Sequence, residues 1–363
     1  MSGELGLQNT FRERIFDPLQ RYRGDQSSGG RDISLEKYME RAGLKNTAGA
    51  PLTLADIYCD LGLDPDRITL GNLLSLSGDI RYLAPEIIRS FIVDGFDAQP
   101  WYQALLAGTE TVGNMTVVTP WFRVTDAVMD ATAEAETIGQ GAVEWGQKTV
   151  TLSKIGKAIS YTDEMMLSVS LPVLSHWMRD LGTRLSAKLN TMAVTTLVNG
   201  DQADGSDSCA VVGVDDTSKG IVYADFVSLW VRGNLLNKNW YTMVANENVA
   251  NTVLNLSEFK APQGAGSPYV QIRNRPEPAS MPLFVSSSVA DDQILFVDPA
   301  ASMIQLNFMP LRVESDRIVL RQISGTVCSL ITGFTTIVRK NRVIMDATKA
   351  RANYNFPSWM TYE

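Results

Sequence analysis

The sequence predicts an α+β fold built from a long β-hairpin, a long amphipathic helix and a closing set of strands. Residues 115–125 and 148–161 are rich in β-branched and aromatic side chains with strand periodicity. Between residues 172 and 198, apolar side chains recur every three or four positions, which predicts one continuous helix. From Leu311 onwards β-prone residues dominate again. The order of hairpin, helix and closing strands therefore indicates the fold class.

The first 77 residues have weak periodicity, with a flexible link predicted at 24–31 and two short helices at 34–42 and 53–61. In the second helix Thr53 is a candidate N-cap, and Asp56 three residues later resembles a capping box. A third helix is predicted at 85–94, with proline in its first turn and Gly95 at its end. Its apolar face comprises Ile87, Ile88, Phe91 and Ile92.

The hairpin is the most unusual predicted element. Its return arm places Val150 and Leu152 at period two, and the pattern continues after Gly156, which is a plausible β-bulge. The connecting segment, 134–146, is rich in glycine and glutamate. A two-stranded hairpin of this length cannot bury both faces by itself in water. It must therefore lie on something else, and a neighbouring subunit is a natural candidate.

The long helix is predicted at 172–198, with Ser170 as a candidate cap and Asn199-Gly200 as its end. At 1.5 Å per residue it would be roughly 40 Å long. We expect its single apolar stripe to be core. The stripe comprises Leu174, Met178, Leu181, Leu185, Leu189, Met192 and Thr196.

Further elements alternate between helix and strand. A helix is predicted at 224–238 with Phe226, Leu229, Trp230 and Gly233 facing inward. A strand at 240–245 precedes a helix that Asn246 caps and that extends to Leu256. A loop at 260–269 precedes strands at 282–288 and 293–299, and closing strands are predicted around 312–314, 318–320 and 334–345.

Composition excludes several classes of protein. Of the 363 residues, 45% are hydrophobic and 20% charged, which is ordinary for a soluble globular protein. No apolar run reaches the roughly 18–20 residues that span a bilayer, and no secretory signal is expected. Three widely spaced cysteines predict a reducing compartment without disulfides or a zinc site. The net charge of −8 argues against tight sequence-independent binding to a polyanion.

The sequence also offers little catalytic chemistry. His176 is the only histidine, which excludes clustered-histidine metal sites and favours a packing or capping role. Residues 141–149 superficially resemble a phosphate-binding loop, but Gln147 breaks the spacing and a strand follows instead of a helix. The pairs Asp215-Asp216 and Asp291-Asp292 are typical of solvated turns. We therefore predict no catalytic, cofactor-binding or metal-binding residue and no enzyme.

The charges of the hairpin have two interpretations. They are either scattered solvated charges or intersubunit ion pairs that fix the register between assembled copies. Each exposed pair would contribute only about 0–1 kcal/mol, so repetition over many copies would carry the effect. The candidate contact residues are Glu134, Glu136, Glu144, Trp145, Lys148, Lys154 and Lys157 in the hairpin, with Arg12 and Arg14 from the N-terminal region.

The order of these elements resembles the major capsid proteins of tailed double-stranded DNA bacteriophages, which have the Hong Kong 97 fold. The resemblance covers roughly residues 77–345. It rests on the loop glutamates, the lysine-bearing return strand, the sequence Ile-Ser-Tyr-Thr-Asp-Glu at 159–164, the long helix and then Asn199-Gly200-Asp201. No single motif is diagnostic, so the order of the elements carries the resemblance.

The resemblance implies a division of the chain. Residues 1–110 would form an N-terminal arm and lead-in helix, and 111–170 the extended β-hairpin loop with strands of the peripheral domain. Residues 171–222 would hold the long spine helix and the rest of that domain, 223–308 the axial domain, and 309–363 the closing strands and C-terminal tail. For the region before residue 77, a small accessory subdomain is the alternative to an arm laid across neighbouring subunits.

The resemblance further implies a structural protein of the virion. Copies would form pentamers and hexamers of an icosahedral shell around double-stranded DNA, in the cytoplasm of a bacterial host. Partners would be other copies, a scaffolding protein, a portal and possibly a decoration protein, without a membrane. Some relatives form a Lys–Asn crosslink, but the matching stretch 321–326 has no asparagine. The alternatives are an encapsulin-type nanocompartment shell and, more distantly, a soluble enzyme with an acidic active site.

Overall fold

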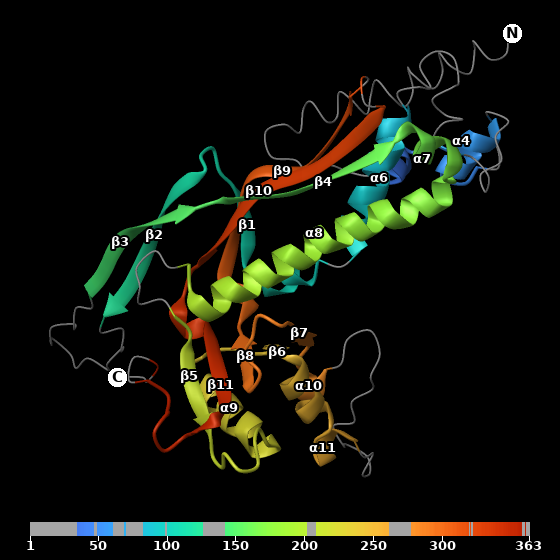
Figure 1. Cartoon of the computed structure of the whole chain (residues 1–363). Helices are drawn as coiled ribbons and strands as arrows, with labels where there is room; N and C mark the ends of the chain where they lie inside the picture. Colours follow the sequence, from blue (N-terminus) through green and yellow to red (C-terminus); the bar gives the residue numbers. More distant parts are fainter. Residues whose placement is uncertain are drawn as a thin grey trace, which may run out of the picture. The chain divides into compact units, whose positions relative to one another are not determined.

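A computed structural model describes residues 35–46, 49–60, 69, 83–98, 100–125, 142–201, 208–260, 277–318, 320, 322–357 and 360. The chain divides into two compact units. Unit 1 comprises Met1–Pro100, Ser153–Lys188 and Asn307–Thr332, and unit 2 comprises Trp101–Leu152, Leu189–Leu306 and Gly333–Glu363. The elements mix α and β structure as the sequence predicted (Figure 1).

The helices of unit 1 largely confirm the predictions. They are α3 (Leu35–Arg41), α4 (Leu54–Asp60), α6 (Leu83–Ala98), α7 (Asp163–Ser168) and the first part of α8 (Leu171–Asn199). The predicted capping box is confirmed, since the backbone N–H of Asp56 donates to Thr53 Oγ1 at 3.2 Å and that of Thr53 to Asp56 Oδ2 at 2.9 Å. Helix α3 packs on α6, where the backbone N–H of Leu35 donates to Ser90 Oγ. The described part of the predicted arm is therefore built into unit 1.

The predicted end of α6 at Gly95 is wrong, because the helix continues to Ala98. Gly95 instead marks the place where α6 and α8 cross. A Cβ atom at Gly95 would overlap the backbone of Arg179, with the Arg179 Cα only 2.6 Å away. A Cβ atom at Gly182 in α8 would likewise meet Ile92 O and, at 2.6 Å, Phe96 N. The two glycines let the helix backbones touch, and Ile88 and Ile92 are buried beside the crossing.

The crossing gives a stability prediction. Replacing Gly182 with alanine should lower the free energy of unfolding by about 1–3 kcal/mol, because the backbones must separate to admit one methyl group. Gly325→Ala is the matched control, since a Cβ atom there would have its nearest neighbour, Ile159 O, at 3.9 Å. Urea unfolding of both variants measures the difference. Equal stability of the two would contradict the close crossing.

The sheet of unit 1 contains a strand that sequence reasoning assigned to the hairpin. Strand β4 (Ser153–Thr162) pairs antiparallel with β10 (Ile323–Thr336), which lies between β4 and β9 (Met303–Ile318). The return arm predicted at 148–161 is therefore two strands in different sheets. The predicted bulge at Gly156 is wrong, because pairing continues through Gly156↔Ser329 without interruption. Gly156 permits close approach instead, since a Cβ atom there would lie 2.8 Å from Cys328 O.

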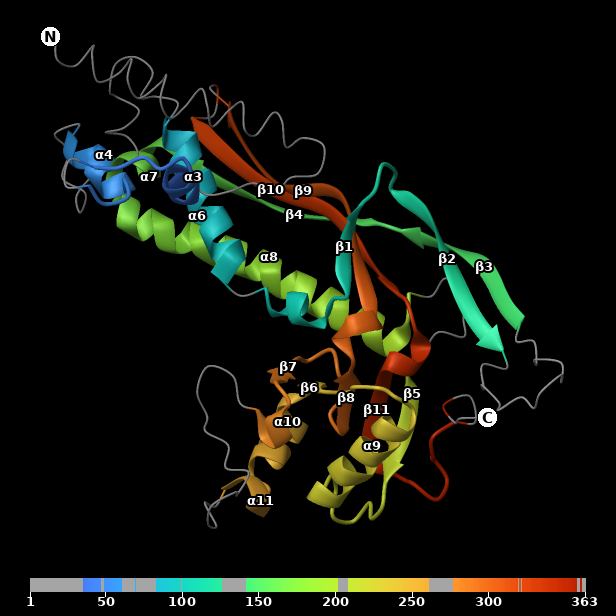
Figure 2. The same ribbon diagram turned by 180° about the vertical axis from the view of Figure 1, so that it is seen from behind.

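Unit 2 is built on a five-stranded mixed sheet in the order β5-β11-β8-β6-β7. The strands are β5 (Ala210–Val214), β6 (Thr242–Ala245), β7 (Leu283–Val285), β8 (Gln293–Val297) and β11 (Arg342–Ala350). Figures 1 and 2 show α9 (Tyr223–Leu235) beside β5 and β11, and α10 (Glu247–Leu254) beside β6 and β7. Phe296 and Val343 in the sheet and Phe226 in α9 belong to one buried core. The unit also contains β1 (Gly108–Thr111), α11 (Ser257–Lys260) and short 3-10 helices at Trp101–Leu105, Pro278–Ser280, Pro299–Ala301 and Arg339–Asn341.

Most helix predictions in unit 2 are confirmed. Asn246 caps α10, and its side chain accepts the backbone N–H of Asn248. Gly200, with φ of +77°, follows the end of α8 as predicted. The inward positions Phe226, Leu229 and Gly233 of α9 are buried. The prediction that Trp230 faces inward is wrong, since this side chain is 64% exposed.

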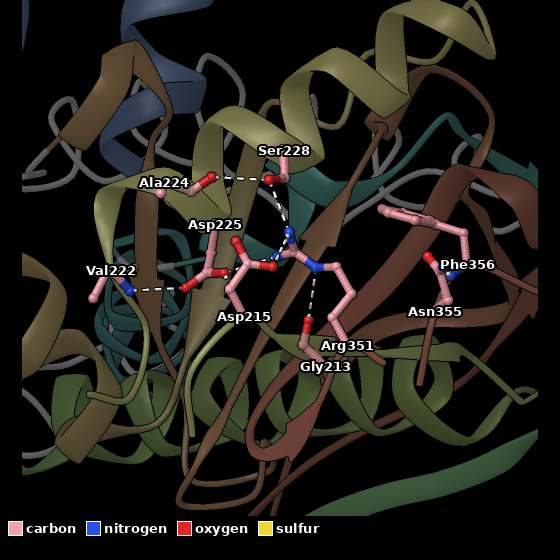
Figure 3. Close-up of polar contacts among 9 residues, drawn as sticks. All are labelled: Gly213, Asp215, Val222, Ala224, Asp225, Ser228, Arg351, Asn355 and Phe356. Atoms are coloured by element: carbon pink, nitrogen blue, oxygen red, sulfur yellow. Dashed lines mark hydrogen bonds and ion pairs between the residues drawn. The ribbon is translucent and has the colours of Figure 1, made fainter. Parts of the chain in front are cut away.

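A buried ion cluster fixes the segment after β11 to α9 (Figure 3). The Arg351 guanidinium donates to Asp225 Oδ1 and to Ser228 Oγ, each at 2.8 Å, and to the carbonyl oxygen of Gly213 at 3.2 Å. Asp225 is completely buried, and its second oxygen accepts the backbone N–H of Val222. Asp215, expected in a solvated turn, also pairs with Arg351. The cluster thus joins the end of β5, α9 and the segment after β11.

Candidate interaction surfaces

The base of the hairpin is fixed by a buried ion pair inside unit 2. The hairpin consists of β2 (Thr116–Thr125) and β3 (Ala142–Thr151). Lys148 Nζ in β3 lies 2.5 Å from Asp201 Oδ2, and both side chains are almost fully buried. The ammonium also donates to the carbonyl oxygen of Thr336 at 2.7 Å, while the same Asp201 oxygen accepts from Thr335 Oγ1 at 2.9 Å. The root of the hairpin is thereby tied to the residue beyond α8 and to the end of β10.

The rest of the hairpin lacks such support. Strands β2 and β3 pair only with each other and form a two-stranded sheet among the described residues. Trp145 is 66% exposed and Val118 is also exposed. A two-stranded ribbon with exposed aromatic and aliphatic side chains is at best marginally stable in water. No third strand covers these side chains among the residues that the structure describes.

Unit 1 carries a groove of about 530 Å³ between β4 and α8. Its floor is apolar and its rim is basic. The floor comprises Ile155, Ile159, Leu181 and Leu185, and Lys157, Arg184 and Lys188 lie at the rim with the half-exposed Trp177. Asp180 is the one acid among the lining residues, and it already pairs with Arg184 at 2.7 Å. The groove is thus suited to a segment that carries acidic and apolar side chains together.

The structure separates the predicted contact residues. Glu134, Glu136, Arg12 and Arg14 lie outside the described residues, and Glu144 lies in β3 opposite Arg123. Trp145, Lys154 and Lys157 are exposed, whereas Lys148 has an internal partner. Lys157 shares a face of β4 with Ile155 and Ile159 in the groove, and Lys154 projects from the opposite face because side chains alternate along a strand. Contact of these residues with a neighbouring subunit stays a prediction.

Sequence reasoning missed Asp201 and the α8 side of the groove. Asp201 was noted only as part of the break after the long helix, and no periodicity links it to Lys148. Trp177, Arg184 and Lys188 follow one another at intervals of seven and four residues, so they form a stripe beside the apolar one. That spacing could have indicated a basic helix face, but only the fold places β4 against it.

Other kinds of site receive no support from the described ranges. No group of three metal-ligating side chains occurs among the described residues. None of the described helices is long and apolar enough to cross a membrane. The segment that superficially resembles a phosphate loop is strand β3 from Ala142 onwards. His176 is exposed on α8, so the packing role expected for it is not observed.

The family model described as "Phage capsid protein" matches residues 146–344. The match covers more than half of the chain. It begins in β3 and ends in β11, so it includes α8, the groove, strands β5, β6, β7 and β8 and the first residues of β11. No curated protein is similar enough in sequence to serve as a relative.

Several solved structures share parts of this architecture at low sequence identity. The virus-like particle from Pyrococcus furiosus is 8% identical with a TM-score of 0.49, covering 72% of this chain and 98% of that one. A chain in the structure of Mycobacterium phage Che8 is 13% identical with a TM-score of 0.47, and the match covers 70% of this chain and 92% of that one. The holo-SrpI encapsulin complex from Synechococcus elongatus is 14% identical with a TM-score of 0.47, covering 70% and 90%.

Proposed function

Because this chain belongs to the phage capsid protein family, we propose that its copies assemble as pentamers and hexamers into an icosahedral head that encloses double-stranded DNA. As a capsid protein with the Hong Kong 97 type of fold it is a structural component of the virion. The observation that best supports assembly is the hairpin. It is held at its base by Lys148 and Asp201, yet exposes Trp145 and Val118 without a third strand among the described residues.

The groove on α8 and β4 supplies a surface for the hairpin of a neighbouring copy. The residues between β2 and β3, 126–141, include Asp126, Asp130, Glu134 and Glu136 together with apolar residues such as Val128 and Ile138, and Glu144 follows in β3. Acidic and apolar side chains are what the basic rim and apolar floor of the groove would accept. We therefore assign Glu134 and Glu136 to contact with Lys157 and Lys188 of the next copy. Trp145 would be covered in the same interface, and Arg12 and Arg14 would contact a further neighbour.

The two compact units suggest how the predicted domains divide the chain. Unit 1, with α6, the first part of α8 and strands β4, β9 and β10, would hold much of the peripheral domain. The five-stranded sheet with α9 and α10 in unit 2 would hold the axial domain. Its strands β6, β7 and β8 fall within the predicted range 223–308, whereas β5 and β11 come from the ranges assigned to the peripheral domain. The net charge of −8 fits a wall that encloses DNA without adhering to it. Assembly would take place in the cytoplasm of the bacterial host, with a scaffolding protein and a portal, and would be followed by expansion through subunit rotation.

The test is electron microscopy and light scattering of the protein expressed alone and together with the products of its neighbouring genes. Closed shells or uniform rings are the expected result. DNA inside the particles would support the phage head, and an enclosed enzyme would favour the encapsulin alternative. A stable monomer under every condition would overturn the assembly proposal.

A further inference from the structure

Helix α9 exposes an apolar face that the described residues leave largely uncovered. Phe226, Leu229 and Gly233 face the core, so the opposite side of the helix should be polar in a monomeric protein. It is instead lined by large apolar side chains at helical spacing. This surface, here called the α9 patch, comprises Tyr223, Val227, Trp230, Val231 and Leu235, together with Tyr241 beyond the helix.

The α9 patch is large for a monomer. Trp230 and Leu235 are 64% and 62% exposed, and the other four side chains are 36–47% exposed. Together they expose on the order of 500 Å² of mostly apolar surface, near the upper end for a patch on a monomeric protein. One partner in a standard interface contributes about 800 Å². The patch is therefore large enough to form the centre of a subunit interface.

On one side, the α9 patch adjoins a hollow and a lysine side chain. Next to Trp230 lies a hollow of about 300 Å³ lined by Gly233, Lys238, Tyr241 and Met281. Lys238 is partly buried at its edge, where burial lowers the pKa of its ammonium group and the charge of Asp298 in the same chain acts in the opposite direction. A complementary surface would offer a small apolar side chain for the hollow and an acid for the rim.

Unit 2 carries such a surface at the other end of the same strands. The hollow is lined by residues just before β6 and β7, whereas Val285 ends β7 and is 54% exposed. Strand β8 runs antiparallel to β6, with Ala245 beside Ile294, so Asp291 and Asp292 lie at the Val285 end. Both aspartates are exposed. This second surface, here called the β7 edge, combines an apolar side chain with acids.

We propose that the α9 patch of one copy binds the β7 edge of a second copy in a head-to-tail contact. Head-to-tail contacts between two different surfaces can be repeated around a closed ring. The inference rests on the proposed function, because a ring of such contacts would form a pentamer or hexamer. The contact explains why Trp230 is exposed in the single chain although the helix pattern placed it inward.

The test uses one variant for each surface. Trp230→Glu with Leu235→Glu damages the α9 patch, and Val285→Lys with Asp291→Lys damages the β7 edge. Each should give a monomer with the thermal unfolding temperature of the unassembled wild type, because all four positions are exposed. Leu235→Glu alone is the milder variant should the first double change impair folding. Thr252→Glu is the matched control, since it places the same charge on the exposed face of α10 and should assemble normally.

Mixing the two variants is the decisive experiment. Each retains one intact surface, so a head-to-tail contact predicts a 1:1 dimer in mass photometry and no larger species. A mixture that stays monomeric, or an α9-patch variant that assembles at the wild-type yield, would overturn the inference. Wild-type protein that forms no rings or shells would instead refute the proposed function, so the two failures are distinguishable.

Discussion

Deleting residues 130–146 should leave a folded protein that forms no shells. The deletion removes the connecting segment and the outer part of β3, including Trp145. It leaves Lys148, Val150 and Leu152, which are buried at the hairpin base, and it touches neither the α6–α8 crossing nor the five-stranded sheet. The thermal unfolding of the unassembled protein should therefore change little, while particle yield in electron microscopy falls to background.

The groove provides a matched pair of variants for the same contact. Lys157→Glu with Lys188→Glu should reduce shell yield as strongly as the deletion, because it reverses the charge of the rim. Lys154→Glu makes one such charge reversal on the opposite face of β4 and should assemble normally, whereas Lys157→Glu alone, which changes the charge equally, should reduce the yield. Shells at normal yield after the deletion would show that the hairpin does not join subunits. If the Lys154 and Lys157 variants lose shell yield equally, the loss is caused by the change in net charge and not by a contact in the groove.

Replacing Lys148 with methionine should lower the free energy of unfolding by about 3–5 kcal/mol. The ammonium is the counter-charge of Asp201, which is 1% exposed at the hairpin base. Without it the carboxylate remains buried, with Thr335 Oγ1 and the Thr336 N–H among its remaining donors. Breaking one side of a buried pair is costly because an uncompensated charge stays in a medium of low polarity. Urea unfolding of the unassembled protein measures the loss.

Two further variants separate this effect from a simple loss of charge. Lys219→Met removes an exposed lysine that pairs with Asp216 at 3.2 Å, and it should cost no more than about 1 kcal/mol. Lys148→Met combined with Asp201→Asn removes both charges and should recover part of the stability lost in the single variant. A Lys148 variant as stable as the Lys219 variant would show that the buried pair does not support the hairpin.

The sequence predicted secondary structure correctly where the residues that determine an element are neighbours along the chain. The stripe from Leu174 to Leu189 predicted α8 to within a residue at each end, because a single apolar face needs only one surface to cover it. Capping chemistry placed the starts of α4 and α10, since those hydrogen bonds join residues two or three apart. The order of hairpin, helix and closing strands was sufficient to indicate the family that the match over residues 146–344 shows.

The mistakes arose where a long-range contact overrides a local preference. Gly95 has the chemistry of a helix end, but α8 approaches it so closely that glycine is needed inside the helix. Gly156 suggested a bulge within a long hairpin arm, because the sequence does not show that β4 pairs with β10. Trp230 looked like a core residue, and only the packing of α9 showed that the core was already complete without it.

The sequence by itself determined the periodicity of the helices and strands, their caps and their order, because these depend on neighbours along the chain. It also predicted a two-stranded hairpin, which is at best marginally stable alone. The tertiary structure decided that Lys148 pairs with Asp201, that Lys157 and Lys154 project from opposite faces of β4, and that Trp230 remains exposed. Each of these depends on which distant segments meet in space, and local residue preferences carry no information about that choice.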